Sequence, residues 1–244
     1  MRWRIGLRKS LENMRDLHPW TLDPTEAIRI QAVLREQLTL EWDGRAVTTV
    51  GGIDIGLEGN IARAAIVVLS YPDLAPLEGV TADVPLVFPY VPGLLAFREG
   101  PAILAAWKKL QIRPDLLMFD GQGIAHPRGL GIASQMGLWL ERPSVGVAKS
   151  RLYGHHTTPG PRRGEWAKLC DERDPARIIG AVLRTREGVN PVYISPGHLI
   201  DLPTCIEFVS KCCSKYRLPE PTRWAHKVAG GESLPVQASQ ARLL

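Results

Sequence analysis

Three carboxylates in the sequence lie where an isolated charge is costly. Asp54 lies inside the otherwise apolar run VTTVGGIDIGL, Asp120 ends the run LLMFD, and Glu99 lies near the start of a helical pattern in FREGP. A buried charge needs an ion partner or a metal. Because Mg²⁺ and Mn²⁺ prefer carboxylate and water ligands, convergence of these side chains predicts an oxygen-rich metal site.

Two of these carboxylates also have simpler interpretations. Asp120 is followed directly by GQG, so it is equally typical of a turn that ends a strand. Asp54 would have to find a salt-bridge partner elsewhere, because its neighbours are glycines and isoleucines. The metal-site hypothesis is therefore the stronger one for Asp54 and an even alternative for Asp120.

Such a site is suited to phosphoryl transfer. A metal held by carboxylates generates hydroxide near neutral pH and neutralises charge that develops on phosphorus. Lys149 ends the apolar run SVGVA and so lies at another strand tip. There it is either a ligand for phosphate or water, or an ordinary surface lysine.

Three further stretches fit contact with nucleic acid. Tyr90 lies between two prolines in FPYVP, and an aromatic on a stiff loop can insert into a base stack. The alternative is a tyrosine packed in a turn. The glycines of DGQGIAHPR (120–128) allow close approach to an extruded base, although a lone His126 is more often structural. Residues 216–226 combine cations with aromatics, a weak signal for phosphate contact.

Hydrophobic periodicity predicts the elements that position these residues. Asp23 and Pro24 begin an amphipathic helix expected over 23–40. Apolar, β-branched runs joined by short links predict a three-strand meander, followed by strands that alternate with helices. We expect strands at 47–57, 63–71, 77–86, 115–120 and 144–148, a late pair at 176–185 and 192–195, helices at 94–110, 131–140 and 201–216, and a loop at 153–166. The sheet is predicted to be mixed, with antiparallel hairpins and parallel crossovers.

Composition sets the outer limits. The chain has 244 residues, of which 45% are hydrophobic and 23% charged, and this excludes a wholly disordered chain. No run of about 18 apolar residues predicts a membrane-spanning helix. The net charge is +5, and most of it lies in residues 1–20, so charge alone is weak evidence for a polyanion partner. The four cysteines form no C-x-x-C pair and are interpreted as reduced thiols, which with no secretory pattern predicts a cytoplasmic protein.

Taken in order, these motifs resemble those of the endonuclease V family, the deoxyinosine-specific repair nucleases. The similarity runs from about Arg15 to Ala229, and its most specific parts are FPYVPGLLAFREGP and DGQGIAHPR. The other segments are GGIDIG, PSVGVAKSRLYG, SPGHLID and RLPEPTRWAH. The resemblance implies an α/β, RNase H-like fold, with a central five-stranded mixed sheet flanked by helices.

The resemblance also implies roles for individual residues. Asp54 and Asp120 match metal-binding aspartates, Glu99 matches a third acidic residue, and Lys149 and His226 match catalytic helpers. A DNA wedge is implied at Pro89, Tyr90, Val91 and Pro92, positions tied to activity and DNA contact at His126 and Arg217, and a hypoxanthine pocket at Gly93, Leu95, Gly121, Gly123 and Ile124.

The implied activity is an Mg²⁺-dependent endonuclease, with Mn²⁺ as a substitute, that acts as a monomer on DNA containing deoxyinosine. It would cut the second phosphodiester bond 3′ to the lesion and leave a 3′-hydroxyl and a 5′-phosphate. One alternative is the same chemistry on inosine-containing RNA, from which DNA differs by the 2′-hydroxyl. The other is a non-catalytic binding protein, which a missing acidic residue would indicate, but all three are present.

The family pattern begins near Arg15 and sets the expected domain limits. We expect residues 1–13 to be a disordered N-terminal extension and 14–230 to be one endonuclease V domain. Residues 231–244 have little periodicity and are expected to form a C-terminal tail.

Overall fold

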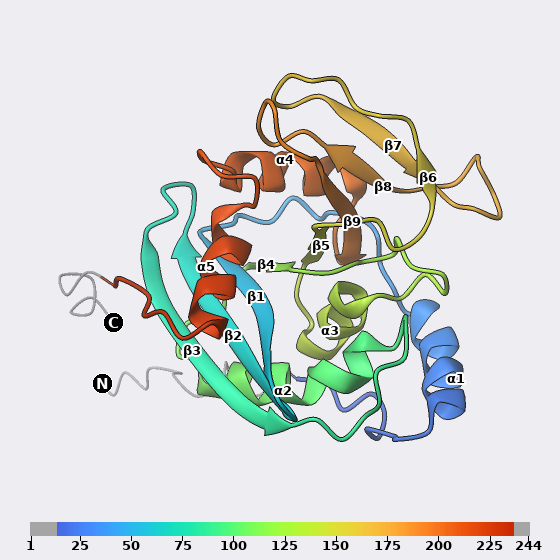
Figure 1. Cartoon of the computed structure of the whole chain (residues 1–244), viewed down its shortest axis with the longest axis vertical. Helices are drawn as coiled ribbons and strands as arrows, with labels where there is room; N and C mark the ends of the chain where they lie inside the picture. The colour runs from blue at the N-terminus through green and yellow to red at the C-terminus, as the bar shows by residue number, and fades with distance from the viewer. Residues whose placement is uncertain (1–13, 237–244) are drawn as a thin grey trace, which may run out of the picture.

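A computed structural model describes residues 14–236, and Figure 1 shows its arrangement of helices around one sheet. The expected extension 1–13 lies outside the described residues, as do residues 237–244 of the expected tail. In the described part, nine strands form one sheet in the order β3-β2-β1-β4-β5-β9-β8-β7-β6. Their bounds are β1 Thr49–Glu58, β2 Ile61–Ser70, β3 Pro76–Pro85, β4 Leu116–Phe119, β5 Ser144–Ala148, β6 His155–His156, β7 Trp166–Cys170, β8 Ile178–Leu183 and β9 Val192–His198.

The first half of this sheet has the predicted topology. β1, β2 and β3 form an antiparallel meander, whose first turn joins the paired residues Glu58 and Ile61. Gly59 in that turn has φ +54°, which glycine adopts without a Cβ penalty. β4 then pairs parallel with β1, and β5 pairs parallel with β4.

Helices cover both faces of the sheet. α2 (Leu95–Lys109) and α3 (Ile132–Leu140) connect the parallel strands and share a core with β1 and β2. α4 (Leu202–Cys212) packs on the opposite face against β4, β5 and β9. α5 (Glu220–Ala229) packs on β2 on that same face, and its residues contact β1. The alternation of strand side chains divides them between the two cores: Leu117 and Phe119 belong to the first, Leu116 and Met118 to the second.

The prediction of a five-stranded sheet is wrong. The five strands expected in the central sheet are β3, β2, β1, β4 and β5, but β5 is not an edge. The late pair predicted at 176–185 and 192–195 is confirmed as β8 and β9, which belong to the same sheet. β9 pairs antiparallel with it, and β8, β7 and β6 continue the sheet. The additional strands satisfy the backbone hydrogen bonds that β5 would otherwise expose.

Several predicted boundaries are also corrected. α1 spans Pro24–Arg35 rather than 23–40; Asp23 caps it as predicted, accepting a hydrogen bond from the Thr25 backbone at 2.9 Å. α4 ends at Cys212 rather than at 216. The segment 153–166, predicted as a loop, contains β6 and the first residue of β7. Among residues 14–236, no helix is both long and apolar enough to cross a membrane.

Candidate metal centre and nucleic-acid pocket

The motif GGIDIG lets a helix lie directly on β1. Gly52, Asp54 and Gly56 share one face of the strand, because side chains alternate. A Cβ on Gly52 would collide with the Pro221 carbonyl of α5, and one on Gly56 would lie 2.9 Å from the Ala229 carbonyl. The two glycines therefore allow α5 to approach closely, with Asp54 between them.

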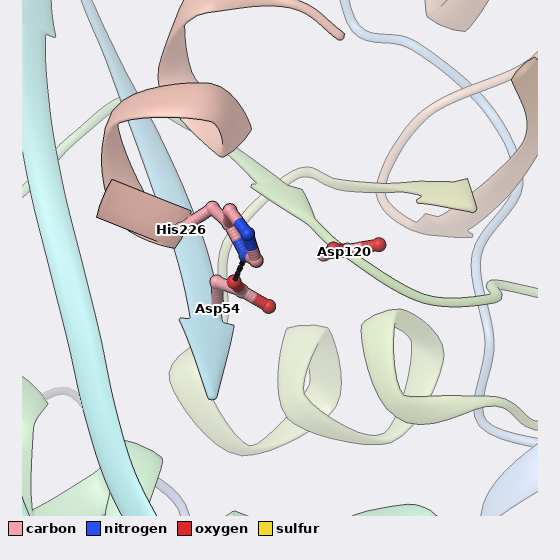
Figure 2. Close-up of side chains that lie close together, drawn as sticks. All are labelled: Asp54, Asp120 and His226. Atoms are coloured by element: carbon pink, nitrogen blue, oxygen red, sulfur yellow. Dashed lines mark hydrogen bonds and ion pairs between the residues drawn. The ribbon is translucent and has the colours of Figure 1, made fainter. Parts of the chain in front are cut away.

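This packing brings His226 of α5 to Asp54. The Nδ1 atom of His226 lies 2.7 Å from Oδ2 of Asp54, and Asp120 points toward the same space from the end of β4 (Figure 2). One ligand atom from each of these three residues lies within 4.8 Å of the others. We call them the Asp54–Asp120–His226 group. Lys149, directly after β5, forms an ion pair with Asp120.

The electrostatics of this group fit a cation. Burial raises the pKa of Asp54, and the charge of Asp120 raises it further, while the hydrogen bond with His226 lowers it. Two carboxylates that repel each other in a largely buried place are stabilised by a divalent ion between them. The donor set, two carboxylates and an imidazole, therefore fits a metal ion.

Glu99 lies outside the Asp54–Asp120–His226 group, although the sequence predicted three converging carboxylates. It is on α2 with only 8% of its surface exposed. Burial raises the pKa of Glu99 to about 8, and the charges of Asp54 and then Asp120 add to this. The charges of both aspartates thus act on the Glu99 carboxyl. The third member of the group is His226 and not Glu99.

A cavity of about 350 Å³ opens beside this group, and we call it the central cavity. Its volume is in the range of pockets that bind small molecules. Asp120 and Lys149 belong to its wall, so cavity and group are continuous. Of the residues predicted to contact DNA or the base, the wall includes Tyr90, Val91, Pro92, Gly93, Leu95, Gly121 and His126.

Four predicted residues are not in that wall. Gly123 packs on β9, where a Cβ would collide with the Pro196 carbonyl, and its N–H donates to Ser195 Oγ at 2.8 Å. Ile124 faces a second cavity. Arg217 donates from Nη2 to the carbonyls of Lys149 (2.5 Å) and Pro191 (2.9 Å), so it fixes the backbone beside Lys149. Pro89 precedes the part of the loop that lines the cavity.

Residues 88–93, which we call the 88–93 loop, have a buried base and an exposed tip. Phe88 is 2% exposed and packs on Phe97, whereas Tyr90 is 72% exposed. The Phe88 carbonyl accepts a hydrogen bond from Nη1 of Arg98 at 2.9 Å. The loop therefore presents one aromatic ring at the mouth of the central cavity.

A family model described as Endonuclease V matches residues 32–227, most of the chain. The chain belongs to the endonuclease V family. An endonuclease V of Trichormus variabilis is 53% identical over 215 residues, which cover 87% of this chain and 96% of that protein. Members of the family are nucleases, so the chain is an enzyme of this class.

Solved structures of endonuclease V match the fold. The Streptomyces avermitilis structure superposes with a TM-score of 0.82 at 38% identity, covering 87% of this chain and 93% of its own. A Ciona intestinalis endonuclease V, at 26% identity and a TM-score of 0.72, covers 84% of this chain and 95% of its own. That protein was solved with a 24mer DNA containing an inosine followed by a ribo-adenosine.

In this endonuclease V fold, Gln31 of α1 is a site residue that the sequence motifs missed. The Gly93 carbonyl accepts hydrogen bonds from Gln31 Nε2 (3.0 Å), His126 Nε2 (2.9 Å) and Arg128 Nη2 (2.7 Å). Gln31 also accepts from Arg128 Nε at 2.6 Å and is 1% exposed. We call these three donors the Gly93 clamp. The available signal was spacing, because Gln31 falls between Ala27 and Leu34 on the buried face of α1.

His126 is a structural member of this clamp. Its Nδ1 accepts the backbone N–H of Arg128 at 3.1 Å, so the proton on the neutral ring is at Nε2, which donates to Gly93. Burial lowers the pKa of His126 to about 4, and the nearby charge of Arg128 adds to this. The side chain is 3% exposed, and its hydrogen bond to the Gly93 carbonyl holds the end of the 88–93 loop.

Proposed function

We propose that this chain hydrolyses DNA at deoxyinosine, cutting the second phosphodiester bond 3′ to the lesion and leaving a 3′-hydroxyl and a 5′-phosphate. The observation that carries the proposal is the continuity between the Asp54–Asp120–His226 group and the central cavity, which share Asp120. A base held in the central cavity would bring the neighbouring phosphates of its own strand next to the Asp54–Asp120–His226 group. The inosine-containing DNA bound by the Ciona intestinalis relative supports this substrate class.

In this proposal Asp54 and Asp120 hold Mg²⁺, for which Mn²⁺ substitutes, and Glu99 holds the metal or its water. When bound, such an ion supplies Lewis-acid stabilisation and a water of lowered pKa. Glu99 fits contact with water because its raised pKa lets it carry or release a proton near neutral pH. Glu99 lies beside the Asp54–Asp120–His226 group and not within it, which supports the second role, contact with a water molecule of the metal.

His226 and Lys149 position the attacking water and the phosphate. The Nδ1 of His226 is engaged with Asp54, so Nε2 is the ring nitrogen that a water molecule can contact. The His226 side chain is 62% exposed, so that nitrogen is accessible to substrate. Lys149 is held by Asp120 at the cavity wall, where its ammonium can contact a phosphate oxygen.

The 88–93 loop and the central cavity read the lesion. Tyr90 fills the gap that the extruded base leaves in the stack, with Pro89, Val91 and Pro92 keeping the loop stiff. The base enters beside Gly93, Leu95 and Gly121, whose lack of bulk or apolar character suits a flat ring. Gly123 and Ile124 support the wall from behind.

The architecture is assigned as RNase H-like, supported by the meander β1–β3 followed by the parallel strands β4 and β5. We assign residues 14–230 to one catalytic domain that acts as a monomer. A chain starting at Met14 is expected to nick inosine DNA with an unchanged kcat. It is expected to bind DNA more weakly only at low salt, because four cations are removed: Arg2, Arg4, Arg8 and Lys9. Loss of folding or lesion specificity would assign residues 1–13 to the domain.

A nicking assay tests the proposal. Duplexes that differ only by one inosine are incubated with the protein in Mg²⁺, in Mn²⁺ and without metal, and products are sized on a sequencing gel. We expect a single nick in the inosine strand, one nucleotide beyond the bond next to the lesion, and only with metal. Equal cutting of both duplexes would refute the assignment. Matched strands with RNA around the inosine decide between DNA and the RNA alternative.

A further inference from the structure

A second cavity, of about 170 Å³, lies behind the wall of the central cavity, and we call it the arginine cavity. It is lined by Arg35 at the end of α1, Arg128 in the loop after β4, and Arg173 and Arg177 in the turn between β7 and β8. His126 belongs to the walls of both cavities. The arginine cavity therefore adjoins the central cavity while being lined by different elements.

The arginines are arranged to receive an anion. Arg128 is fixed by bonds from Nε to Gln31 and from Nη2 to Gly93, which leaves Nη1 for a ligand. No side chain within residues 14–236 bonds the guanidinium of Arg173. Arg177 is held only loosely, at 3.8 Å from Asp171, and its side chain is half exposed. Arg35 is paired with the exposed Glu36.

Two carboxylates also line the arginine cavity, but both are engaged locally. Asp171 accepts hydrogen bonds from the Tyr153 hydroxyl and the Arg173 backbone N–H, each at 2.8 Å. Asp174 accepts the backbone N–H of Ala176 at 3.1 Å. The arginines outnumber the carboxylates by two to one, so the cavity keeps an excess of positive charge. Guanidinium groups match the oxygens of a phosphate in geometry and stay charged at any working pH.

The order of the sites along the molecule fits a position for this cavity along the substrate strand. The segment 120–132 begins at Asp120 in the acidic group, lines the central cavity, and carries His126 and Arg128 to the arginine cavity. In Figure 1, α5 lies left of the centre of the molecule and α1 at its right-hand side. The central cavity thus shares Asp120 with the Asp54–Asp120–His226 group and His126 with the arginine cavity, so a strand with a base in the central cavity can reach both.

We propose that the arginine cavity binds a backbone phosphate of the lesion strand on the 5′ side of the extruded nucleotide. This inference rests on the proposed function, because the cut 3′ to the lesion assigns the acidic group to the 3′ side. The arginine cavity and the Asp54–Asp120–His226 group would together hold the strand on the 5′ and 3′ sides of the flipped nucleotide. Its contribution is independent of base identity, since phosphate contacts fix register and orientation.

The test removes Arg173 and Arg177, which line the arginine cavity but neither the central cavity nor the Gly93 clamp. The variant is Arg173→Ala/Arg177→Ala, and its matched control is Arg29→Ala/Arg162→Ala, which removes two exposed arginines that line neither cavity. Binding of an inosine duplex is titrated in Ca²⁺, which replaces Mg²⁺ to prevent cutting, over a range of salt. We expect about fivefold weaker binding at low salt and a salt-dependence slope reduced by about one in the first variant only.

Substrate chemistry then identifies the phosphate. A single neutral methylphosphonate is placed one, two or three nucleotides 5′ of the inosine, or at the same distances on the 3′ side. At one 5′ position it should weaken binding by the wild type as much as the arginine substitutions do, and have no further effect on the variant. Additive losses at every 5′ position, or equal slopes for the variant and its control, would overturn the proposal. Failure of the wild type to nick inosine DNA would instead refute the proposed function.

Discussion

The Asp54–Asp120–His226 group and the 88–93 loop meet at one cavity but are built differently. The group lies on and between elements of regular structure, with Asp54 in the middle of β1 and His226 on a helix that two glycines admit. The loop is irregular, and three donors of the Gly93 clamp fix its end. The two carboxylates of the group repel each other, whereas the polar atoms of the clamp have hydrogen-bond partners.

This difference indicates how each region should respond to change. Strained charges are relieved when one is removed, so the acidic group is expected to be functionally essential but dispensable for folding. The clamp is the reverse, because its buried donors and acceptors lose partners when a member is replaced. Substitutions in the two regions therefore separate catalysis from recognition.

The largest effect is expected at Asp54. Asp54→Asn should lower the nicking rate by at least about 10²- to 10³-fold, the loss typical of removing one electrostatic stabiliser. Because its pKa is raised in the folded state, the ionised carboxylate is unfavourable there in the absence of metal. Thermal unfolding in EDTA should thus show a Tm equal to or above that of the wild type. Binding of inosine DNA in Ca²⁺ should be largely kept. Asp120→Asn is expected to behave in the same way, and near-normal nicking by either variant would remove these residues from the site.

The next effect is expected at the tip of the loop. Base–aromatic stacking contributes about 1–3 kcal/mol, so Tyr90→Ala should weaken binding of inosine DNA by about 10- to 100-fold. Undamaged DNA, which has no extruded base, should lose much less affinity. Tyr90→Phe is the matched control, because it keeps the ring and removes only the hydroxyl. Titrations in Ca²⁺ measure all three proteins. If Tyr90→Phe fails as badly as Tyr90→Ala, stacking is not the main interaction.

Sequence reasoning located the parts whose signal is local. The apolar runs of β1 to β5 can be recognised from neighbouring residues alone. The same is true of the N-cap of α1 and of the aspartates at strand positions. β6 and β7 were missed because their residues are largely exposed and become strands only by pairing across the sheet. α5 was not predicted as a helix because Pro219 and Pro221 resemble loop residues, although proline is well tolerated in a first helical turn.

The same limit applies within the site. Tyr90 and the carboxylates were found from residue type and local context, but Gln31 was not, since its partners lie 62 and 97 residues away. The position of Glu99 outside the group depends on how α2 packs, which no spacing along the chain encodes. Long-range hydrogen bonds and helix packing are where the three-dimensional structure adds most to the motifs.

A smaller effect is expected at Gln31. Gln31→Leu keeps most of the side-chain volume but removes one of three donors to the Gly93 carbonyl and the acceptor for Arg128. One net hydrogen bond contributes about 1 kcal/mol, so binding of inosine DNA should weaken by roughly three- to tenfold. Gln31→Glu keeps an acceptor for Arg128 but loses the donor, and so should be equally weak.

A double-mutant cycle tests whether Gln31 acts through the loop. If the clamp serves to hold Tyr90, Gln31→Leu should cost little further affinity in a Tyr90→Ala background. Val33→Leu is the control for a substitution in α1 that leaves the Gly93 clamp intact, because Val33 lies at an exposed position on the same helix. Fully additive losses would mean that Gln31 supports the protein in general and not the wedge.

The smallest effects are expected in the pH dependence of stability, where Glu99 beside the Asp54–Asp120–His226 group and His126 in the Gly93 clamp should act with opposite signs. Burial raises the pKa of Glu99 to about 8 and lowers that of His126 to about 4. For Glu99 the folded state holds its proton more tightly, so its stabilising contribution is full below about pH 4.5 and is lost as the pH rises toward 8. For His126 the folded state resists protonation, so its contribution is full above about pH 6.5 and is lost as the pH falls toward 4.

Two substitutions should therefore flatten opposite limbs of one curve. We expect Glu99→Gln to flatten the alkaline limb and His126→Gln the acid limb of Tm against pH, measured in EDTA. One unit of pKa shift corresponds to about 1.4 kcal/mol, which moves the Tm of a chain this size by about 3–5 °C. His198 also has its pKa lowered to about 4 by burial and lies outside both cavity walls, so His198→Gln is the control that flattens the acid limb without weakening lesion binding. His126→Gln should flatten the acid limb and also weaken lesion binding, because His126, unlike His198, donates to the Gly93 carbonyl. If Glu99→Gln leaves the alkaline limb unchanged, burial and the charge of Asp54 do not raise the pKa of Glu99 enough to affect stability.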